Sequence, residues 1–304
     1  MLCGFLQSIE VERMSEQLFG GGWTEEKLRI LKHYLNAYTT ALKKQPFTKV
    51  YIDVFAGTGY RQQRKRLYDL PSLFKDTEQE ESEEFLKGSA ILALEASPAF
   101  DKYIFVESDP GKVGELKKLQ QQHPRVSDSI EVFEGDANKF IPSYCAKENW
   151  ENTRAVMFLD PFATQVDWQS IVAVAQTKSI DIWILFPLMA VNRLLARDAE
   201  RAFFESLTRI FGTDQWFQAF YQKQRVQDIF GKPMEVVAKA CNFETIGQFY
   251  QKRLRTIFGA GVADTTKVLC NSHGSPLFQL FFAAGNPKGA PIAVRIANYL
   301  LGKL

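Results

Sequence analysis

The chain has 304 residues, of which 46% are hydrophobic and 24% are charged, and its formal net charge at pH 7 is +2. These proportions are typical of a globular protein with a sizeable core and give no compositional reason to expect wholesale disorder. So small a net charge does not by itself indicate a polyanionic partner. No run of residues approaches the roughly 18 apolar residues that a membrane span requires, so we expect no membrane partner.

The opening segment and the cysteines indicate the compartment. The segment MLCGFLQ is apolar but short, and Glu10 and Glu12 follow it at once, so we expect no secretory signal. The four cysteines, which lie far apart and form no C-x-x-C pair, are Cys3, Cys145, Cys241 and Cys270. We therefore expect a reduced, cytoplasmic protein without a structural metal.

The first predicted element is a helix at about 25–44. Thr24 is a typical N-cap residue, the acidic Glu25 and Glu26 follow it, and leucine and tyrosine side chains then recur at helical spacing. The preceding residues, 1–22, include a run of three glycines and are expected to form a flexible leader.

Five short segments rich in Val, Ile, Phe or Tyr follow this helix at wide intervals. They lie at 50–57, 103–108, 130–136, 155–161 and 181–187. Such runs are typical of parallel strands buried on both faces, and the stretches between them supply the crossover connections. The pattern predicts an open, doubly wound sheet.

The C-terminal part of the chain predicts an antiparallel hairpin, with strands at about 266–271 and 276–283, and a closing helix at about 289–302. Before the hairpin, the aromatic-rich segment 193–258 is predicted to be a helical insertion whose aromatic side chains are mostly core. An earlier insertion, 60–87, begins with a basic run and then turns acidic, which is typical of an exposed loop.

These elements together predict an α/β fold: a Rossmann-like, doubly wound, mostly parallel sheet of about seven strands with a C-terminal antiparallel hairpin and a helical insertion. The expected division of the chain is a flexible leader at 1–22, a Rossmann-like core made of 23–192 and 259–304, and the helical insertion at 193–258.

The predicted parallel strands end in acidic residues. The first ends at Asp53, the second at Glu107 and Asp109, the third at Asp136 and the fourth at Asp160. Desolvating a carboxylate is costly unless something pairs with it, so carboxylates gathered at one sheet edge indicate hydrogen-bond donors or a cation on a ligand. The alternative for each one singly is a helix cap or a solvated strand end.

A glycine-containing turn follows the first strand. Gly57 and Gly59 permit close approach of the backbone to a ligand, but the third glycine of a dinucleotide fingerprint is missing, which disfavours a nicotinamide cofactor. S-Adenosylmethionine fits better. Its methionine moiety would lie at the glycine turn, both ribose hydroxyls on Glu107 and the adenine amino group on Asp136, and its sulfonium cation suits an acidic edge.

The fourth strand ends in Asp160-Pro161-Phe162. When a methyl group is transferred to an exocyclic amino group, a carboxylate and a backbone carbonyl that accept hydrogen bonds from the amino group localise its lone pair, and an aromatic ring stacks on the flat acceptor. Asp160, Pro161 and Phe162 are the candidate catalytic residues on this interpretation. The alternative is that Asp160 caps the next helix and Phe162 packs in the core.

Several motifs, taken in order, resemble those of one known family. They are VYIDVFAGTG, KGSAILAL, IFVESD, GDA, FLDPFATQVDW, DIWILFPL and PLFQLFFAAGNP. Over about residues 23–302 the chain resembles the bacterial three-Cys-motif partner family, which is similar to class I S-adenosylmethionine-dependent methyltransferases. The resemblance implies a Rossmann-like methyltransferase core and a genomic partner protein that carries the three-cysteine motif.

The strand ends and this likeness together give the expected cofactor-binding residues. They are Asp53, Phe55, Ala56, Gly57, Thr58, Gly59, Glu107, Ser108, Asp109, Asp136, Ala137 and Asp160. Amino-methyltransferases typically have Asp or Asn, Pro, Pro and an aromatic residue after the fourth strand. This chain has Asp160, Pro161, Phe162 and Ala163, so the target atom stays open.

The leading hypothesis is a methyltransferase that uses S-adenosylmethionine and acts on a nucleic acid or on a nucleobase amino group. The basic run at 61–66 and the basic segment 193–258 favour a nucleic-acid partner. One alternative is a non-catalytic module that keeps the fold and serves a three-Cys-motif protein. Another is a magnesium-dependent nuclease that uses the gathered carboxylates as ligands, although a metal site would not explain the glycine turn.

Overall fold

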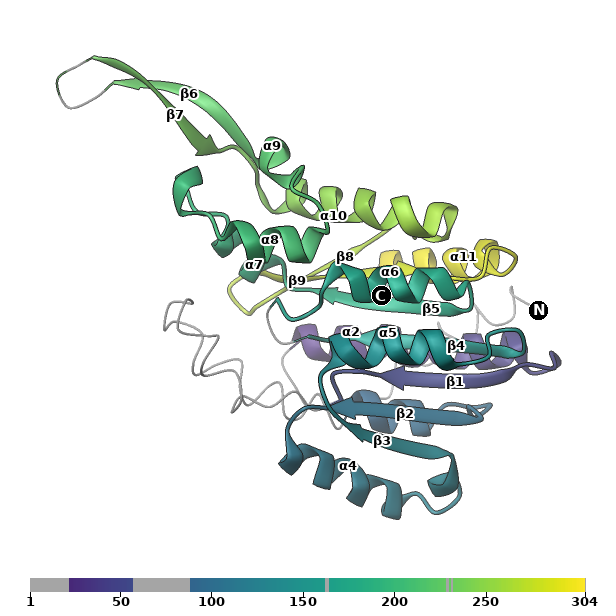
Figure 1. The fold of residues 1–304 in the computed structure, drawn as a ribbon. Helices are drawn as coiled ribbons and strands as arrows, with labels where there is room; N and C mark the ends of the chain where they lie inside the picture. Colours follow the sequence, from purple (N-terminus) through teal and green to yellow (C-terminus); the bar gives the residue numbers. More distant parts are fainter. Residues whose placement is uncertain (1–21, 57–87, 162–163, 228–229, 231, 304) are drawn as a thin grey trace.

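The computed structural model describes residues 22–56, 88–161, 164–227, 230 and 232–303. Its centre is a seven-stranded sheet with the strand order β3-β2-β1-β4-β5-β9-β8, and a separate two-stranded sheet pairs β6 with β7 (Figure 1). The strands are β1 (Thr48–Asp53), β2 (Lys102–Glu107), β3 (Ile130–Glu134), β4 (Thr153–Leu159), β5 (Ile180–Phe186), β6 (Tyr221–Gln227), β7 (Pro233–Lys239), β8 (Lys267–Cys270) and β9 (Pro276–Ala283). The helices are α2 (Gly22–Leu42), α4 (Pro110–Gln122), α5 (Ala137–Lys147), α6 (Trp168–Thr177), α7 (Leu188–Leu194), α8 (Phe204–Phe211), α9 (Trp216–Phe220), α10 (Phe243–Phe258) and α11 (Ala290–Lys303), and residues 88–94 are also helical.

Strands β1 to β5 run parallel, and β9 pairs antiparallel with both β5 and β8. All seven residues of β5 are buried, as are five of the six residues of β2. Burial on both faces explains why these strands are nearly continuous apolar runs rather than alternating ones. The five predicted parallel strands, the C-terminal hairpin of β8 and β9 and the Rossmann-like, doubly wound fold class are confirmed. The expected burial on both faces is wrong for β3, which lies at the edge of the sheet and of whose residues Ile130 alone is buried.

Helices cover both faces of the sheet, and each face has its own core. On one face, α2, α11 and residues 88–94 pack over side chains such as Tyr51 and Trp183. On the other face, α5, α6, α7 and α10 pack over side chains such as Ile182 and Phe186. Neighbouring residues of β5 therefore belong to different cores, because successive side chains of a strand point to opposite faces.

The segment 193–258 differs from the expected helical insertion. Helices α8, α9 and α10 are present, but β6 and β7 between them pair antiparallel over their whole length. Val236 and Val237 favour a strand and Pro233 disfavours a helix interior, so these local preferences override the helical spacing of the aromatic residues around them. The aromatic side chains of the helices are largely core, as expected; Phe211, for example, is fully buried.

The start of the described chain also differs in detail from the expectation. Helix α2 begins at Gly22, so Thr24, the expected N-cap, lies inside the helix and is buried. The expected leader at 1–22 and the insertion at 60–87 fall, apart from Gly22, outside the described residues, and the division of the chain into domains stays a prediction. Within the described part of the chain, no helix combines the length and the apolar character needed to cross a bilayer.

A buried carboxyl group joins the first helix to the sheet. Asp181 of β5 accepts a hydrogen bond from the Tyr34 hydroxyl of α2 at 2.8 Å and one from the Gly285 backbone N–H at 3.1 Å. Burial raises the pKa of Asp181 to about 6, although both hydrogen bonds oppose the shift. The carboxyl group is therefore mostly ionised in the folded protein only above about pH 6, where the carboxylate depends on its two donors.

Removing the Tyr34 hydroxyl tests this contact. We expect Tyr34→Phe to lower the free energy of unfolding by about 1–3 kcal/mol near pH 8, because a buried carboxylate loses a donor. The loss should be smaller near pH 5, where the carboxyl group is mostly protonated and needs less stabilisation. Urea denaturation of the wild type and the variant at both pH values measures the loss in free energy of unfolding. Tyr38→Phe removes the same atom from the next turn of the helix, and an equal loss in both variants would contradict the assignment.

Candidate functional site

Three carboxylates meet at the carboxyl ends of adjacent strands. Asp53 is the last residue of β1, Glu107 is the last residue of β2, and Asp160 directly follows β4. Because β2, β1 and β4 are neighbours and run parallel, these residues lie at one sheet edge. Their charges interact, since Asp160 and Glu107 each raise the pKa of Asp53. The structure thus brings together three of the residues predicted from strand ends.

Asp53 is the most deeply buried of the three, with 1% of its surface exposed. Oδ2 accepts from the Ser89 hydroxyl at 2.9 Å and from the Tyr51 hydroxyl at 3.5 Å, and Oδ1 accepts from the Phe55 backbone N–H at 3.3 Å. The pKa of Asp53 is raised to about 7, mainly by burial and further by Asp160 and Glu107, while the hydrogen bonds from Ser89 and Phe55 oppose the shift. Near neutral pH this group is therefore poised between its two protonation states.

Glu107 has two unequal carboxylate oxygens. Oε1 accepts from the backbone N–H groups of Ser108 at 2.6 Å and Asp109 at 2.7 Å, and from the Ser108 hydroxyl at 3.2 Å. Oε2 is buried, yet no donor among the described residues reaches it. Burial raises the pKa of Glu107, and the backbone N–H groups and Lys112 oppose the rise. The loop after β2 therefore fixes one oxygen and leaves the other for an additional donor.

Asp160 forms an ion pair with a lysine of the first helix. Its Oδ2 lies 3.2 Å from Lys27 Nζ, and the side chains of the two residues are only 11% and 2% exposed, respectively. The same ammonium group lies 4.5 Å from the ring centroid of Trp23. Burial raises the pKa of Asp160, and Lys27 lowers it. A carboxylate that would otherwise be costly to bury thus has a cation beside it.

Asp160 is not the cap of the helix that follows it. Helix α6 begins at Trp168, and Asp167 occupies its N-cap position. Pro161 is buried, whereas Phe162, with its packing alternative, and Ala163 lie outside the described residues.

Two other predicted acids serve as helix caps. Asp109 accepts hydrogen bonds from two backbone N–H groups of α4, and Asp136 accepts two from α5, the shorter ones both at 2.8 Å. Asp136 is exposed, and Ala137 after it is buried. The cap alternative thus describes the contacts of Asp109 and Asp136, in contrast to those of Asp53, Glu107 and Asp160.

The turn after β1 is described only in its first half. Phe55 and Ala56 are buried, and the Ala56 N–H donates to the Val106 carbonyl of β2 at 3.1 Å. The expected cofactor residues Gly57, Thr58 and Gly59 lie outside the described residues. In the described part of the chain, no group of three His, Cys, Asp or Glu side chains has an arrangement suited to a metal ion.

The sequence analysis missed two residues of this site, Lys27 and Ser89. Lys27 lies on the apolar stripe of α2, four residues before Leu31, so a charged residue at a core position was the available signal. Ser89 belongs to the motif KGSAILAL, but nothing in its spacing connects it with Asp53, because residues 57–87 separate Ser89 from the described end of the β1 turn.

The sheet order and the helices on both faces define a Rossmann-like α/β protein. Among solved structures, the chain is similar to the YcgJ protein from Bacillus subtilis, at 12% identity and a TM-score of 0.33, over 82% of this chain and 96% of that one. It is also similar to a dimethyladenosine transferase from Plasmodium falciparum, at 14% identity and a TM-score of 0.28, over 75% and 70% of the two chains. A third similar structure is a conserved hypothetical protein from Streptococcus pyogenes, at 12% identity and a TM-score of 0.30, over 68% and 95%.

No protein-family model matches the chain, and no curated protein matches it. Likeness to solved structures at these TM-scores carries no argument about activity.

The raised pKa of Asp53 predicts how folding stability depends on pH. Its folded pKa of about 7 exceeds the ordinary value of 3.8, so the folded protein keeps a proton that the unfolded chain has released. The stability contributed by this group is complete below the ordinary pKa and is lost as the pH rises through about 7. We therefore expect the free energy of unfolding of the wild type to fall as the pH rises from about 5 to about 8.5. In Asp53→Asn, which has no carboxyl group at this position, the fall should be smaller.

Urea denaturation at several pH values in that range measures this difference. Asp128→Asn changes an exposed carboxyl group away from the site and is expected to keep the pH dependence of the wild type. If Asp53→Asn and the wild type lost stability in parallel, the proton held by Asp53 would not be the source of the pH dependence.

Proposed function

We propose that this protein is a methyltransferase that uses S-adenosylmethionine and that its acceptor is an amino group of a nucleobase in nucleic acid. The observation that carries the proposal is the buried Oε2 of Glu107, for which no described residue supplies a donor. An oxygen in this state is costly unless a bound group donates to it. The hydroxyls of a ribose are donors of the right kind.

The surroundings of Glu107 fit an adenosyl cofactor in two further respects. Two backbone N–H groups hold Oε1, so the carboxylate is oriented before any ligand arrives. Asp53 lies close enough for the two charges to interact and would add negative potential for a cationic ligand. Glu107 would therefore hold the ribose, and Asp53 would favour the positive charge of the cofactor.

When bound, the cofactor supplies an electrophilic methyl group on a sulfonium. The methyl group would pass to the acceptor nitrogen as the carbon–sulfur bond breaks with its electron pair left on sulfur, and the nitrogen would then release a proton to water. Asp160 would accept a hydrogen bond from the amino group through Oδ1, because Lys27 occupies Oδ2. Lys27 is thus a positioning residue that keeps Asp160 ionised and oriented.

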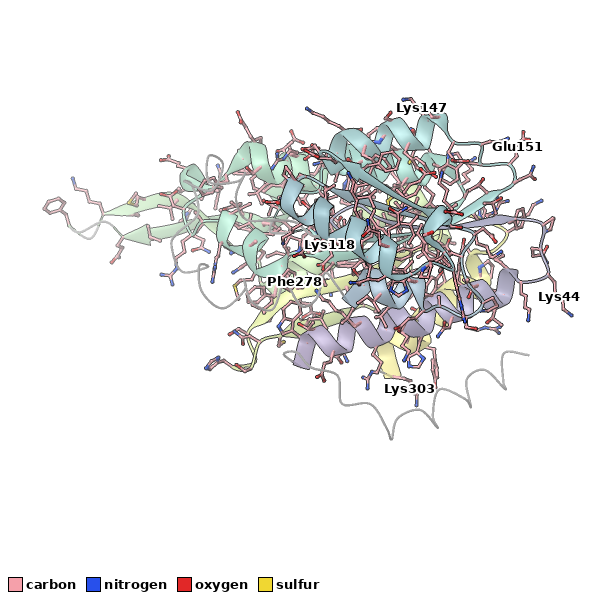
Figure 2. All side chains as sticks on the ribbon, turned by 90° about the horizontal axis from the view of Figure 1, so that it is seen from below. Lys44, Lys118, Lys147, Glu151, Phe278 and Lys303 are labelled. Atoms are coloured by element: carbon pink, nitrogen blue, oxygen red, sulfur yellow. The ribbon has the colours of Figure 1, made fainter. Side chains whose placement is uncertain are left out.

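The cofactor half of the proposal predicts the effect of Glu107→Gln. This substitution replaces one carboxylate oxygen by an NH2 group and removes the negative charge that accepts hydrogen bonds from the ribose. We expect the Kd for S-adenosylmethionine to rise about 10- to 100-fold. Isothermal titration calorimetry measures the change. Glu151→Gln is the matched control. Glu151 is exposed in the loop before β4, at the end of the strands opposite to the carboxylates (Figure 2). Equal affinity in all three proteins would refute the assignment of Glu107.

The catalytic half predicts a different pattern for Asp160→Asn. We expect methyl transfer to fall on the order of 100-fold because the amino group loses its charged acceptor. The affinity for S-adenosylmethionine should stay within about threefold, because Glu107 and not Asp160 holds the ribose. Transfer of a labelled methyl group to duplex DNA measures the rate, and calorimetry on the same sample shows that the site is intact.

The non-catalytic alternative makes the opposite prediction. The Lys27 ion pair is the observation that favours it, because one acceptor oxygen of Asp160 is already occupied. If the wild type bound the cofactor but transferred no methyl group to nucleic acid, and Asp160→Asn kept the biological activity, a module that serves a three-Cys-motif protein would be the better description.

A further inference from the structure

The two-stranded sheet of β6 and β7 forms an arm that projects from the body of the protein (Figure 1). It extends on the side of the molecule on which the arrows of β1 to β5 end. In the view of Figure 2 it again lies at the far end of the molecule from Lys44, which is in the turn before β1. The arm is therefore on the same side as the carboxylates at the strand ends.

Much of the arm is exposed, β6 more than β7. Six of the seven residues of β6 are exposed, and Tyr221 at its base is buried. In β7, Pro233, Met234 and Glu235 are exposed, whereas residues 236–239 are partly buried near the body of the protein. Apolar side chains share this exposure: Phe230, between the two strands, is 80% exposed, and Met234 is 46% exposed. A two-stranded ribbon is marginally stable by itself, and its exposed apolar groups contribute nothing to the core. These features indicate a surface that binds a partner.

The register gives the two faces of the arm different chemistry. Residues directly opposite each other share a face, so one face carries no charge and combines amides with apolar groups. That face consists of Gln222, Gln224, Val226, Met234, Val236 and Ala238. The other face is charged and includes Lys223, Arg225 and Glu235. The stretch 221–239 has four basic and two acidic residues, or 4 − 2 = +2.

The basic side chains of the charged face are available to a ligand. Lys223 and Arg225 lie 3.8 and 3.9 Å from Glu235, and their side chains are 77% and 86% exposed. Ion pairs this long and this exposed contribute little, so a stronger anion would displace Glu235. Phosphate groups of a nucleic acid are such anions.

We infer that the arm lies in the major groove of duplex DNA. That groove is about 12 Å wide and admits a two-stranded ribbon, whereas the deep, narrow major groove of duplex RNA does not admit side chains. Glutamine pairs with adenine edges and apolar groups contact thymine methyls, which matches the uncharged face. The groove is about 8.5 Å deep, so Lys223 and Arg225 on the outward face lie near the height of the phosphates.

Phe230 adds a further contact to this arrangement. An exposed aromatic ring between the two strands would contact thymine methyl groups in the groove. A base that is the methyl acceptor would have to leave the stack to reach Asp160, since enzymes that act on a base take it out of the stack. This inference rests on the proposed function only where the bound duplex is also the methyl acceptor; binding of DNA by the arm does not depend on it.

Fluorescence anisotropy with a labelled DNA duplex of about 30 base pairs, without cofactor, tests the arm. We expect the variant Lys223→Glu/Arg225→Glu to bind at least about tenfold more weakly than the wild type at physiological salt. The slope of log K against log salt, where K is the association constant, should become less negative by about two, because two phosphate contacts are lost. Phe230→Ser should weaken binding without changing the slope, because it removes no charge. Lys43→Glu/Lys44→Glu is the matched control, with the same charge change in an exposed turn at the opposite end of the molecule.

Calorimetry with S-adenosylmethionine on the arm variants separates the two proposals. Unchanged cofactor affinity with lost DNA binding supports the arm and shows that the variants are folded. A wild type that binds DNA but not the cofactor would remove the proposed function and leave the arm intact. The inference is overturned if the wild type does not bind the duplex, or if the arm variants bind it as the wild type does. It is also overturned if sedimentation shows that the wild type is a dimer and that the arm variants are monomers with unchanged DNA binding, because the arm would then be a dimer contact.

Discussion

The burial of Asp53, Glu107 and Asp160 at one edge of the sheet is the constraint on which the site depends. Parallel pairing of β2, β1 and β4 forces these residues together, because each follows or ends its strand. Three carboxylates this close repel one another and lose hydration, so each needs its own compensation. The protein supplies a hydroxyl and a backbone N–H to Asp53, a loop of backbone N–H groups to Glu107 and the ammonium of Lys27 to Asp160.

These three kinds of compensation give the carboxylates different chemical characters. Among the described residues, the donors to Asp53 are neutral, and its pKa is raised to about 7. Asp160 has a full positive charge beside it, which favours ionisation against the effect of burial. Oε1 of Glu107 has donors, whereas no described residue donates to Oε2. A ribose and an amino group are both donors, so under the proposed function Glu107 would accept from the first and Asp160 from the second.

Sequence reasoning was most reliable where one preference dominated. The central parallel strands and their acidic ends were predictable, because a run such as DIWILF is short, apolar and rich in Ile, Trp and Phe, as strands of a sheet covered on both faces are. The β6–β7 arm was not predictable from the aromatic spacing, because its strands are set by local β preference and a turn. The contact of Lys27 with Asp160 spans 133 residues of sequence, and only the packing of α2 against the sheet creates it. The glycine turn that supported the cofactor prediction lies outside the described residues.

The Lys27–Asp160 pair is not explained by stability alone. Burying two charges costs several kcal/mol of hydration for each ion, and an apolar pair of similar size at such a place is often at least as stable. Asp160 could also lose its charge by protonation, since burial already raises its pKa, but Lys27 opposes this. Lys27 therefore favours the ionised form of Asp160 in a place where a neutral group would be easier to bury. Such an arrangement is advantageous for a reaction that needs a charged hydrogen-bond acceptor shielded from water, because the acceptor interacts more strongly there than at an exposed position.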